Sequence, residues 1–166
     1  MNIKIISCLF LFLAIIFPSV GSSDQESFIF RPNIGYSSID GDKFSLLSVR
    51  ILSVLSQKRK VGLDFAYFKN KEEDKEENNF TVIGATWEEK FFGWFNCGFG
   101  PALYLNFGDQ EKDEEEDTFG FISDLGWEPN NFYGGLNPFI TYRNDFIFSD
   151  DNKMGHSIVV GLSFDL

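Results

Sequence analysis

The amino-acid sequence predicts an all-β protein, an eight-stranded antiparallel up-and-down transmembrane β-barrel that follows a cleaved signal peptide. Three observations support this prediction. The chain begins with a short apolar run, and the rest divides into eight segments in which apolar and polar residues alternate. Aromatic residues make up 17% of the chain, yet its mean hydropathy is −0.11. Large apolar residues must therefore alternate with polar ones, as in a barrel wall between lipid and a polar interior.

The first residues have the three parts of a secretory signal peptide. Lys4 supplies a positive charge, residues 5–17 are apolar almost without a break, and residues 19–21 place small side chains where signal peptidase cleaves. The apolar run is shorter than the roughly 20 residues of a membrane-spanning helix. We expect residues 1–21 to be removed and residues 22–166 to form one outer-membrane β-barrel domain. The alternative for the apolar run is a membrane anchor or a buried helix.

The composition narrows the classes of partner and site. The chain has 25 acidic and 14 basic residues and a net charge of −11, whereas binding to nucleic acid requires a basic surface. Its two cysteines are Cys8 and Cys97, and Cys8 leaves with the signal peptide, so the mature chain cannot form an intramolecular disulfide. No glycine-rich phosphate-binding loop is present, and we expect no cofactor.

Eight segments of the mature chain read as strands separated by charged or turn-like stretches. They cover residues 28–39, 44–55, 61–68, 80–88, 95–107, 119–127, 138–148 and 157–166. The alternation lasts about 8 to 12 residues in each, which suits tilted membrane strands better than the shorter strands of a soluble sandwich.

The segment at 95–107 is the clearest of the eight, and the segment at 80–88 is the least clear. In the clearest, one face carries Phe95, Cys97, Phe99, Pro101, Leu103, Leu105 and Phe107, which we expect to contact lipid. In the other, Thr81, Ile83, Ala85 and Trp87 compete with Phe80, Val82 and Gly84 for the lipid side. The register of this fourth strand is therefore left open.

The connections between the segments indicate which end of the barrel faces outward. An even number of strands puts both termini at the periplasmic end, so the connections alternate in exposure. The outward connections are residues 40–43, 69–79, 108–117 and 149–155, and the inward ones are residues 56–60, 89–93 and 128–135. The two longest outward connections are rich in Asp and Glu, which predicts acidic extracellular loops that repel anions.

The tryptophans give an independent check on this arrangement. Trp87, Trp94, Trp127 and Tyr133 all fall toward the periplasmic ends of their segments or in the inward connections. Trp and Tyr favour the membrane interface, so we expect these four residues to form an aromatic girdle there.

The C-terminus carries a short motif of Gly161, two residues, aromatic Phe164, one residue and terminal Leu166. This motif resembles the C-terminal signal of outer-membrane barrels, although many of those end in Phe. With the eight segments, the mature chain resembles the small eight-stranded bacterial outer-membrane barrels of the OmpA/OmpX-like class. The resemblance implies insertion into the Gram-negative outer membrane by the barrel-assembly machinery, and contact with outer-membrane lipid and lipopolysaccharide.

Charged residues also lie on the face that we expect to line the lumen. These are Arg31, Arg50, Arg143, Asp64, Asp124, Asp145 and Asp165. An eight-stranded barrel is only wide enough for side chains to fill it, and buried charges must be paired. The pattern therefore predicts an ion-pair network that plugs the lumen instead of a conducting pore.

Two further features could carry chemistry. The acidic run Asp113, Glu114, Glu115, Glu116 and Asp117 could collect hard cations through carboxylate oxygens, but it has no spaced calcium-loop pattern and reads more simply as a solvated loop. His156, the one histidine, could serve a lipid A-modifying enzyme. Lipid A deacylases, however, carry His-x-Ser on one strand face, and here Ser157 is adjacent to His156 and faces the other way.

The sequence therefore favours an outer-membrane barrel with a structural or surface-interaction role, whose extracellular ligand it does not identify. Two alternatives stay open. One is a deacylase-like lipid A-modifying barrel that uses His156. The other is a soluble periplasmic carrier similar to lipocalins, in which the Phe-rich faces would point inward around a ligand.

Overall fold

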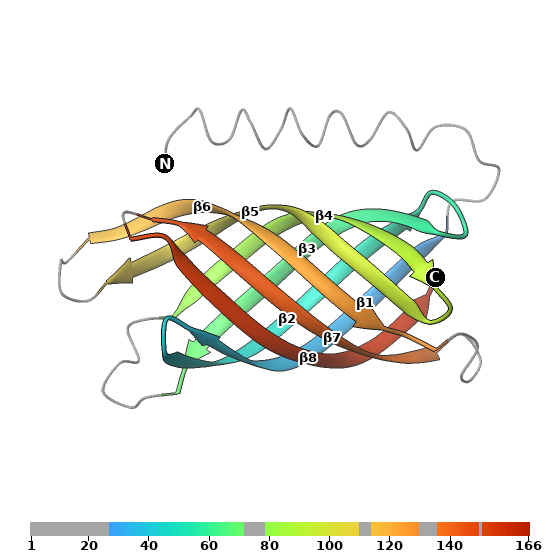
Figure 1. Ribbon diagram of the computed structural model, residues 1–166, viewed down its shortest axis with the longest axis horizontal. Helices are drawn as coiled ribbons and strands as arrows, with labels where there is room; N and C mark the ends of the chain where they lie inside the picture. Colours follow the sequence, from blue (N-terminus) through green and yellow to red (C-terminus); the bar gives the residue numbers. More distant parts are fainter. Residues whose placement is uncertain (1–26, 72–78, 110–113, 130–135, 150) are drawn as a thin grey trace.

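Eight antiparallel strands pair in chain order in the computed structural model, and the last pairs with the first to close a barrel (Figure 1). The structure describes residues 27–71, 79–109, 114–129, 136–149 and 151–166. The expected signal peptide lies outside the described residues. The described residues contain no helix that could span a membrane. The predicted all-β, eight-stranded barrel is confirmed.

The strands are longer than those of most soluble sheets, with 12 to 15 residues each. They are β1 (Phe28–Ile39), β2 (Asp42–Val54), β3 (Arg59–Asn70), β4 (Phe80–Phe92), β5 (Phe95–Asp109), β6 (Glu114–Trp127), β7 (Leu136–Phe148) and β8 (Lys153–Asp165). This length is ample for strands that cross a bilayer at a tilt.

Large apolar side chains cover the outside of the barrel, as strand alternation predicts. Ile34 is 61% exposed, Leu47 59% and Ile158 58%, and each alternates with neighbours that point into the lumen. The Phe-rich faces therefore point outward, which is the reverse of what a lipocalin-like carrier requires.

The fourth strand has the register in which Phe80 and Val82 face the lumen. Phe80 is 3% and Val82 0% exposed, whereas Ile83 and Trp87 lie on the outer wall. The choice follows from the cross-strand neighbours, because Phe80 pairs with Phe68, which is also fully buried.

Most turns are shorter than the connections expected from the sequence, because the strands extend beyond the segments in which hydrophobicity alternates. The turn after β1 is formed by Asp40 and Gly41, both with positive φ (52° and 92°), the conformation that Asp-Gly favours in a tight hairpin. The expected loop at 108–117 is wrong at both ends, since β5 continues to Asp109 and β6 already begins at Glu114. The β5–β6 hairpin projects beyond the barrel at the end opposite the C-terminus (Figure 1).

A β-bulge near the C-terminal end of β5 changes which way Phe107 points. Tyr104 pairs with Thr118 but Phe107 pairs with Glu116, so β5 has one extra residue at this point, and Asn106 adopts a positive φ of 59°. The expectation that Phe107 contacts lipid is therefore wrong. Its ring lies inside, 5.0 Å from the ring of Phe80 between centroids.

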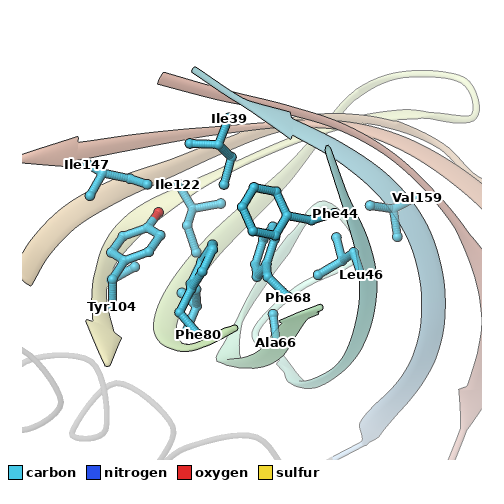
Figure 2. Close-up of a cluster of buried hydrophobic side chains, with 12 residues drawn as sticks. Ile39, Phe44, Leu46, Ala66, Phe68, Phe80, Tyr104, Ile122, Ile147 and Val159 are labelled. Atoms are coloured by element: carbon cyan, nitrogen blue, oxygen red, sulfur yellow. The ribbon is translucent and has the colours of Figure 1, made fainter. Parts of the chain in front are cut away.

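An apolar cluster fills the half of the lumen nearer the β1–β2 turn (Figure 2). Figure 2 shows the rings of Phe44, Phe68, Phe80 and Tyr104, which come from four consecutive strands, lying side by side inside the barrel. Phe68 and Phe80 are stacked at 4.5 Å, and Phe44 meets Phe80 edge-on at 5.4 Å. We call this group, with the aliphatic side chains around it, the apolar plug. It consists of Ile39, Phe44, Leu46, Ala66, Phe68, Phe80, Val82, Ala102, Tyr104, Ile122, Ile147 and Val159, with Phe107 packed against it.

Candidate functional site

Beside the apolar plug, toward the end of the barrel where β1 begins and β8 ends, the lumen holds two linked groups of ion pairs. The first is centred on Arg31 of β1. Its guanidinium bonds Glu88 of β4, with 2.5 Å between Nη1 and Oε2, and also Glu128, which follows β6. Lys60 Nζ lies 3.2 Å from Glu88 and 3.6 Å from Glu128, so Arg31 and Lys60 share both carboxylates.

The second group lies next to the first and reaches the base of the plug. Arg50 Nη2 lies 2.7 Å from Asp124 and 3.1 Å from Asp64. Arg143 Nη1 contacts the same Asp64 oxygen at 2.9 Å, and its Nη2 contacts Asp145 at 2.8 Å. Arg50 also lies 3.8 Å from Glu88, which connects the two groups. All these side chains are nearly or wholly buried, so the charges are stabilised by one another instead of by water.

The structure brings six of the seven predicted lumen residues together and leaves one out. Arg31, Arg50, Arg143, Asp64, Asp124 and Asp145 all lie in the network. The prediction that Asp165 belongs to the network is wrong. Its side chain faces the lumen by strand parity but is exposed at the rim near the C-terminus, and it forms none of these ion pairs within the described part of the chain.

The sequence pattern does not predict three members of the network: Lys60, Glu88 and Glu128. Each stood at the edge of an expected segment or inside an expected turn. A signal for Glu88 did exist, since it shares strand parity with Phe80 and Val82, but it could be used only once the register of the fourth strand was known.

A small cavity remains among the polar side chains of the lumen. Its volume is about 20 Å³, and Asn33, Ser48, Asp64 and Arg143 are among the residues that line it. The second oxygen of Asp64 is buried without a hydrogen-bond partner. The cavity has room for roughly one water molecule, which could satisfy such an oxygen but could not support ion flow.

Tyr104 joins the polar and apolar parts of the lumen. Its ring packs against Phe80 and Phe107 in the plug, while its hydroxyl donates a hydrogen bond of 2.8 Å to Asp145 in the network. Tyr104 therefore links the plug directly to the network.

His156 lies on the outer wall of β8 within a group of polar side chains. Its Nδ1 is 2.8 Å from both the hydroxyl of Tyr142 and Oδ1 of Asn144, and its ring stacks on Tyr142 at 6.0 Å. Ser157 is 1% exposed, on the lumen side of the same strand. The two adjacent residues therefore lie on opposite sides of the wall, where no nucleophile–base contact can form between them.

The structure describes three of the four residues of the predicted aromatic girdle. Trp94 and Trp127 meet edge-on at 6.1 Å at the β4–β5 and β6 ends, next to exposed Phe91 and Phe92. Trp87 lies on the outer wall further along β4, paired with Phe99. Tyr133 lies outside the described residues.

The residues of the C-terminal motif lie in and just after β8, where the barrel closes. Phe164 pairs with Phe30 of β1, with ring centroids 6.4 Å apart, and the Leu166 amide donates to the Phe28 carbonyl at 2.8 Å. A side chain at Gly161 would come within 2.5 Å of the Pro32 carbonyl oxygen, so this position requires glycine for the close approach of β1.

The structure describes only part of the acidic run that could form a weak metal site. Asp113 lies outside the described residues, as do the side chains of Glu114, Glu115 and Glu116, and Asp117 is exposed on β6. Within the described residues, no group of three or more His, Cys, Asp or Glu side chains could hold a metal ion.

Comparison with known proteins gives matches in structure only. No protein-family model matches the sequence, and no curated protein matches it. Neisserial surface protein A (NspA) superposes with a TM-score of 0.61 at 13% identity, over 85% of this chain and 97% of that one. A designed transmembrane β-barrel gives 0.51 at 8% identity, over 87% and 98%. Ail, the attachment invasion locus protein of Yersinia pestis, gives 0.48 at 15% identity, over 87% and 100%. The chain has the fold of the small eight-stranded barrels of bacterial outer membranes.

Proposed function

We propose that this protein is an outer-membrane β-barrel with a structural or surface-interaction role, acidic extracellular loops and a lumen closed by side chains. One observation carries the proposal: a closed barrel that exposes its aromatic and aliphatic residues outside and buries its charges inside. This inverts the arrangement of a soluble protein, and it is the arrangement that a hydrocarbon environment stabilises.

The filled lumen supports a role other than transport through the barrel. An ion that crossed would have to separate the pairs around Arg31 and Arg50 and then displace the rings of the apolar plug. Both barriers are large in a low-dielectric interior. The same reasoning favours a protein whose contacts with other molecules are made by its outer loops and its outer wall.

Assembly and surroundings belong to the same proposal. We propose that the signal peptide over residues 1–21 directs export, that the barrel-assembly machinery reads the final strand, and that outer-membrane lipid and lipopolysaccharide surround the wall. The exposed aromatic residues at the periplasmic end, such as Phe92 at 74% and Trp94 at 51%, support an anchor at the membrane interface.

The first test is the gel mobility of the protein from the membrane fraction, with and without boiling. A compact form that migrates fast before boiling and slowly afterwards is the expected result, and N-terminal sequencing should then begin at Ser22. Recovery in the soluble periplasm without a heat-dependent shift would contradict the proposal.

The closed lumen needs a second measurement. Folded protein in planar lipid bilayers should show no steady conductance, because both the network and the plug cross the lumen. Reproducible unit conductances would show that the filling opens, and they would replace a structural role with that of a channel.

A further inference from the structure

Three lysines gather on the outer wall at the outward end of β2 and β3. Lys43, Lys69 and Lys71 are all exposed, and we call them the lysine cluster. The Lys71 amide donates to the Lys43 carbonyl at 2.9 Å, so these two residues lie opposite each other on neighbouring strands. Lys69 lies two residues before Lys71, which directly follows the last residue of β3, and both side chains are on the same face.

The lysine cluster begins where the apolar wall ends. On β1, β2 and β3 the exposed apolar row below it consists of Ile34, Leu47 and Tyr67, which pair with one another across the strands. The next outward row is Tyr36, Ser45 and Lys69, and the row after that is Ser38, Lys43 and Lys71. β2 and β3 therefore change from apolar to polar and cationic at the same row, and β1 changes one row later, after Tyr36.

Tyr36 contacts the side chain of Lys71 and restricts its position. Lys71 Nζ lies 4.6 Å from the centroid of the Tyr36 ring, a cation–π contact that reaches from the end of β3 to β1. This contact holds the ammonium against the wall, above Ile34, instead of letting it extend into solvent. An ammonium held there can contact a ligand whose apolar part covers the wall below.

The charge of the cluster contrasts with that of the whole chain. The net charge is −11, so an anionic ligand gains no general attraction from this protein and must find a local cationic site. Lys43, Lys69 and Lys71 form no ion pair with another described residue. An acidic stretch follows Lys71 in the sequence, and it is the competing partner that an experiment must separate from a ligand.

We infer that the lysine cluster with Tyr36 binds the phosphate-bearing headgroup of a lipid in the outer leaflet, whose acyl chains cover Ile34, Leu47 and Tyr67. Lysine binds phosphate as a compact point charge, and cationic side chains just beyond an apolar wall are placed to meet anionic headgroups. The inference rests on the proposed location in the outer membrane and adds a ligand class and a binding surface to it.

The test uses the mature chain folded in detergent, with diphosphorylated lipid A and its dephosphorylated form as probes. Native mass spectrometry counts the lipid molecules retained by each variant. Replacement of all three lysines (K43Q/K69Q/K71Q) should weaken retention of diphosphorylated lipid A about a hundredfold, and K69Q alone about fivefold. The matched control K58Q/R59Q/K90Q removes the same charge at the periplasmic end and should retain the lipid as the unmodified chain does.

Each result separates the inference from its alternatives. Equal retention by the triple variant and the unmodified chain would overturn it. Displacement of the lipid by millimolar inorganic phosphate would show a site for free phosphate and would overturn it as well. Phosphate-dependent retention that appears only after the acids at 72–77 are neutralised would show that this stretch, not lipid, occupies the lysines.

A heat-dependent gel shift is recorded for every variant before lipid is added. Loss of the shift in the unmodified chain would contradict the proposed outer-membrane barrel itself. A normal shift without selective retention would contradict only the lipid site.

Discussion

Arg31 and Glu88 join β1 to β4 across the lumen, with 2.5 Å between Nη1 and Oε2. The two strands are not neighbours in the sheet, so the pair fixes the wall at two distant points. The exposed fractions of the two side chains are 4% and 2%. At such depth an ion pair contributes less through its own attraction than through the cost of breaking it, because a lone buried charge is strongly disfavoured.

Glu88→Gln should therefore destabilise the barrel by about 3 to 5 kcal/mol, since Arg31 and Lys60 lose a shared carboxylate. The measurement is urea unfolding of the detergent-folded barrel, followed by the loss of the fast-migrating gel form. The matched control is Glu89→Gln, whose partner Arg59 is 3.3 Å away on the surface. That change should cost less than about 1 kcal/mol. Similar midpoints for the two variants would contradict a structural role for the network.

Phe80→Ala tests the apolar plug. Phe80 contacts the rings of Phe44, Phe68 and Phe107, so its removal leaves a cavity that should cost about 3 to 5 kcal/mol. The same truncation at Phe121, whose ring is 36% exposed on the outer wall, should cost less. Unfolding midpoints in detergent compare the two.

The Phe80→Ala barrel should still show no steady conductance in planar bilayers, because the ion pairs below the plug remain in place. A pore opened by this single change would mean that the plug alone closes the lumen.

The sequence predicts the fold well because alternation with a period of two leaves a clear signal in the part of each strand that contacts hydrophobic surroundings. It fails where that signal is absent. Residues 114–117 are all acidic, so nothing in their pattern distinguishes the loop that we expected from the strand that the structure contains. The hairpin that they extend projects beyond the barrel, where an apolar outer face is not required (Figure 1).

Strand parity predicts which charged residues of the candidate site lie inside the lumen. Arg31, Arg50 and Arg143 lie inside because parity places them there, but parity gives no depth along the barrel axis. Asp165 has the correct parity and lies at the open rim, while Glu128 follows the last residue of β6 and still reaches Arg31. Which carboxylates pair with which cations depends on contacts between strands that are far apart in the sequence.

The bulge at Asn106 is a second feature that parity cannot predict, and it can be tested directly. A positive φ costs most residues about 1 to 2 kcal/mol, less for Asn and nothing for glycine. Asn106→Gly should leave the stability of the barrel unchanged or slightly higher, whereas Asn106→Val should lower it by about that amount. Unfolding midpoints in urea measure both. Equal stability of the Val and Gly variants would show that the left-handed backbone at this position is not needed to turn Phe107 inward.

The geometry around His156 argues against a lipid A deacylase. Ser157 points into the lumen and His156 points out, and Ser38, which pairs with His156 on β1, forms no hydrogen bond with it in the described part of the chain. A deacylase requires a serine within hydrogen-bond reach of its base. Expression in an outer membrane should therefore leave the acyl chains of lipid A unchanged, and mass spectra of lipid A from the unmodified protein and from His156→Ala should be identical. The variant should still show the heat-dependent gel shift, because its partners Tyr142 and Asn144 lie on the outer wall, where loss of one side chain creates no cavity in the lumen. A lipid A species that lacks one acyl chain and disappears in His156→Ala would instead establish a catalytic role for this histidine, with a nucleophile supplied from elsewhere in the chain.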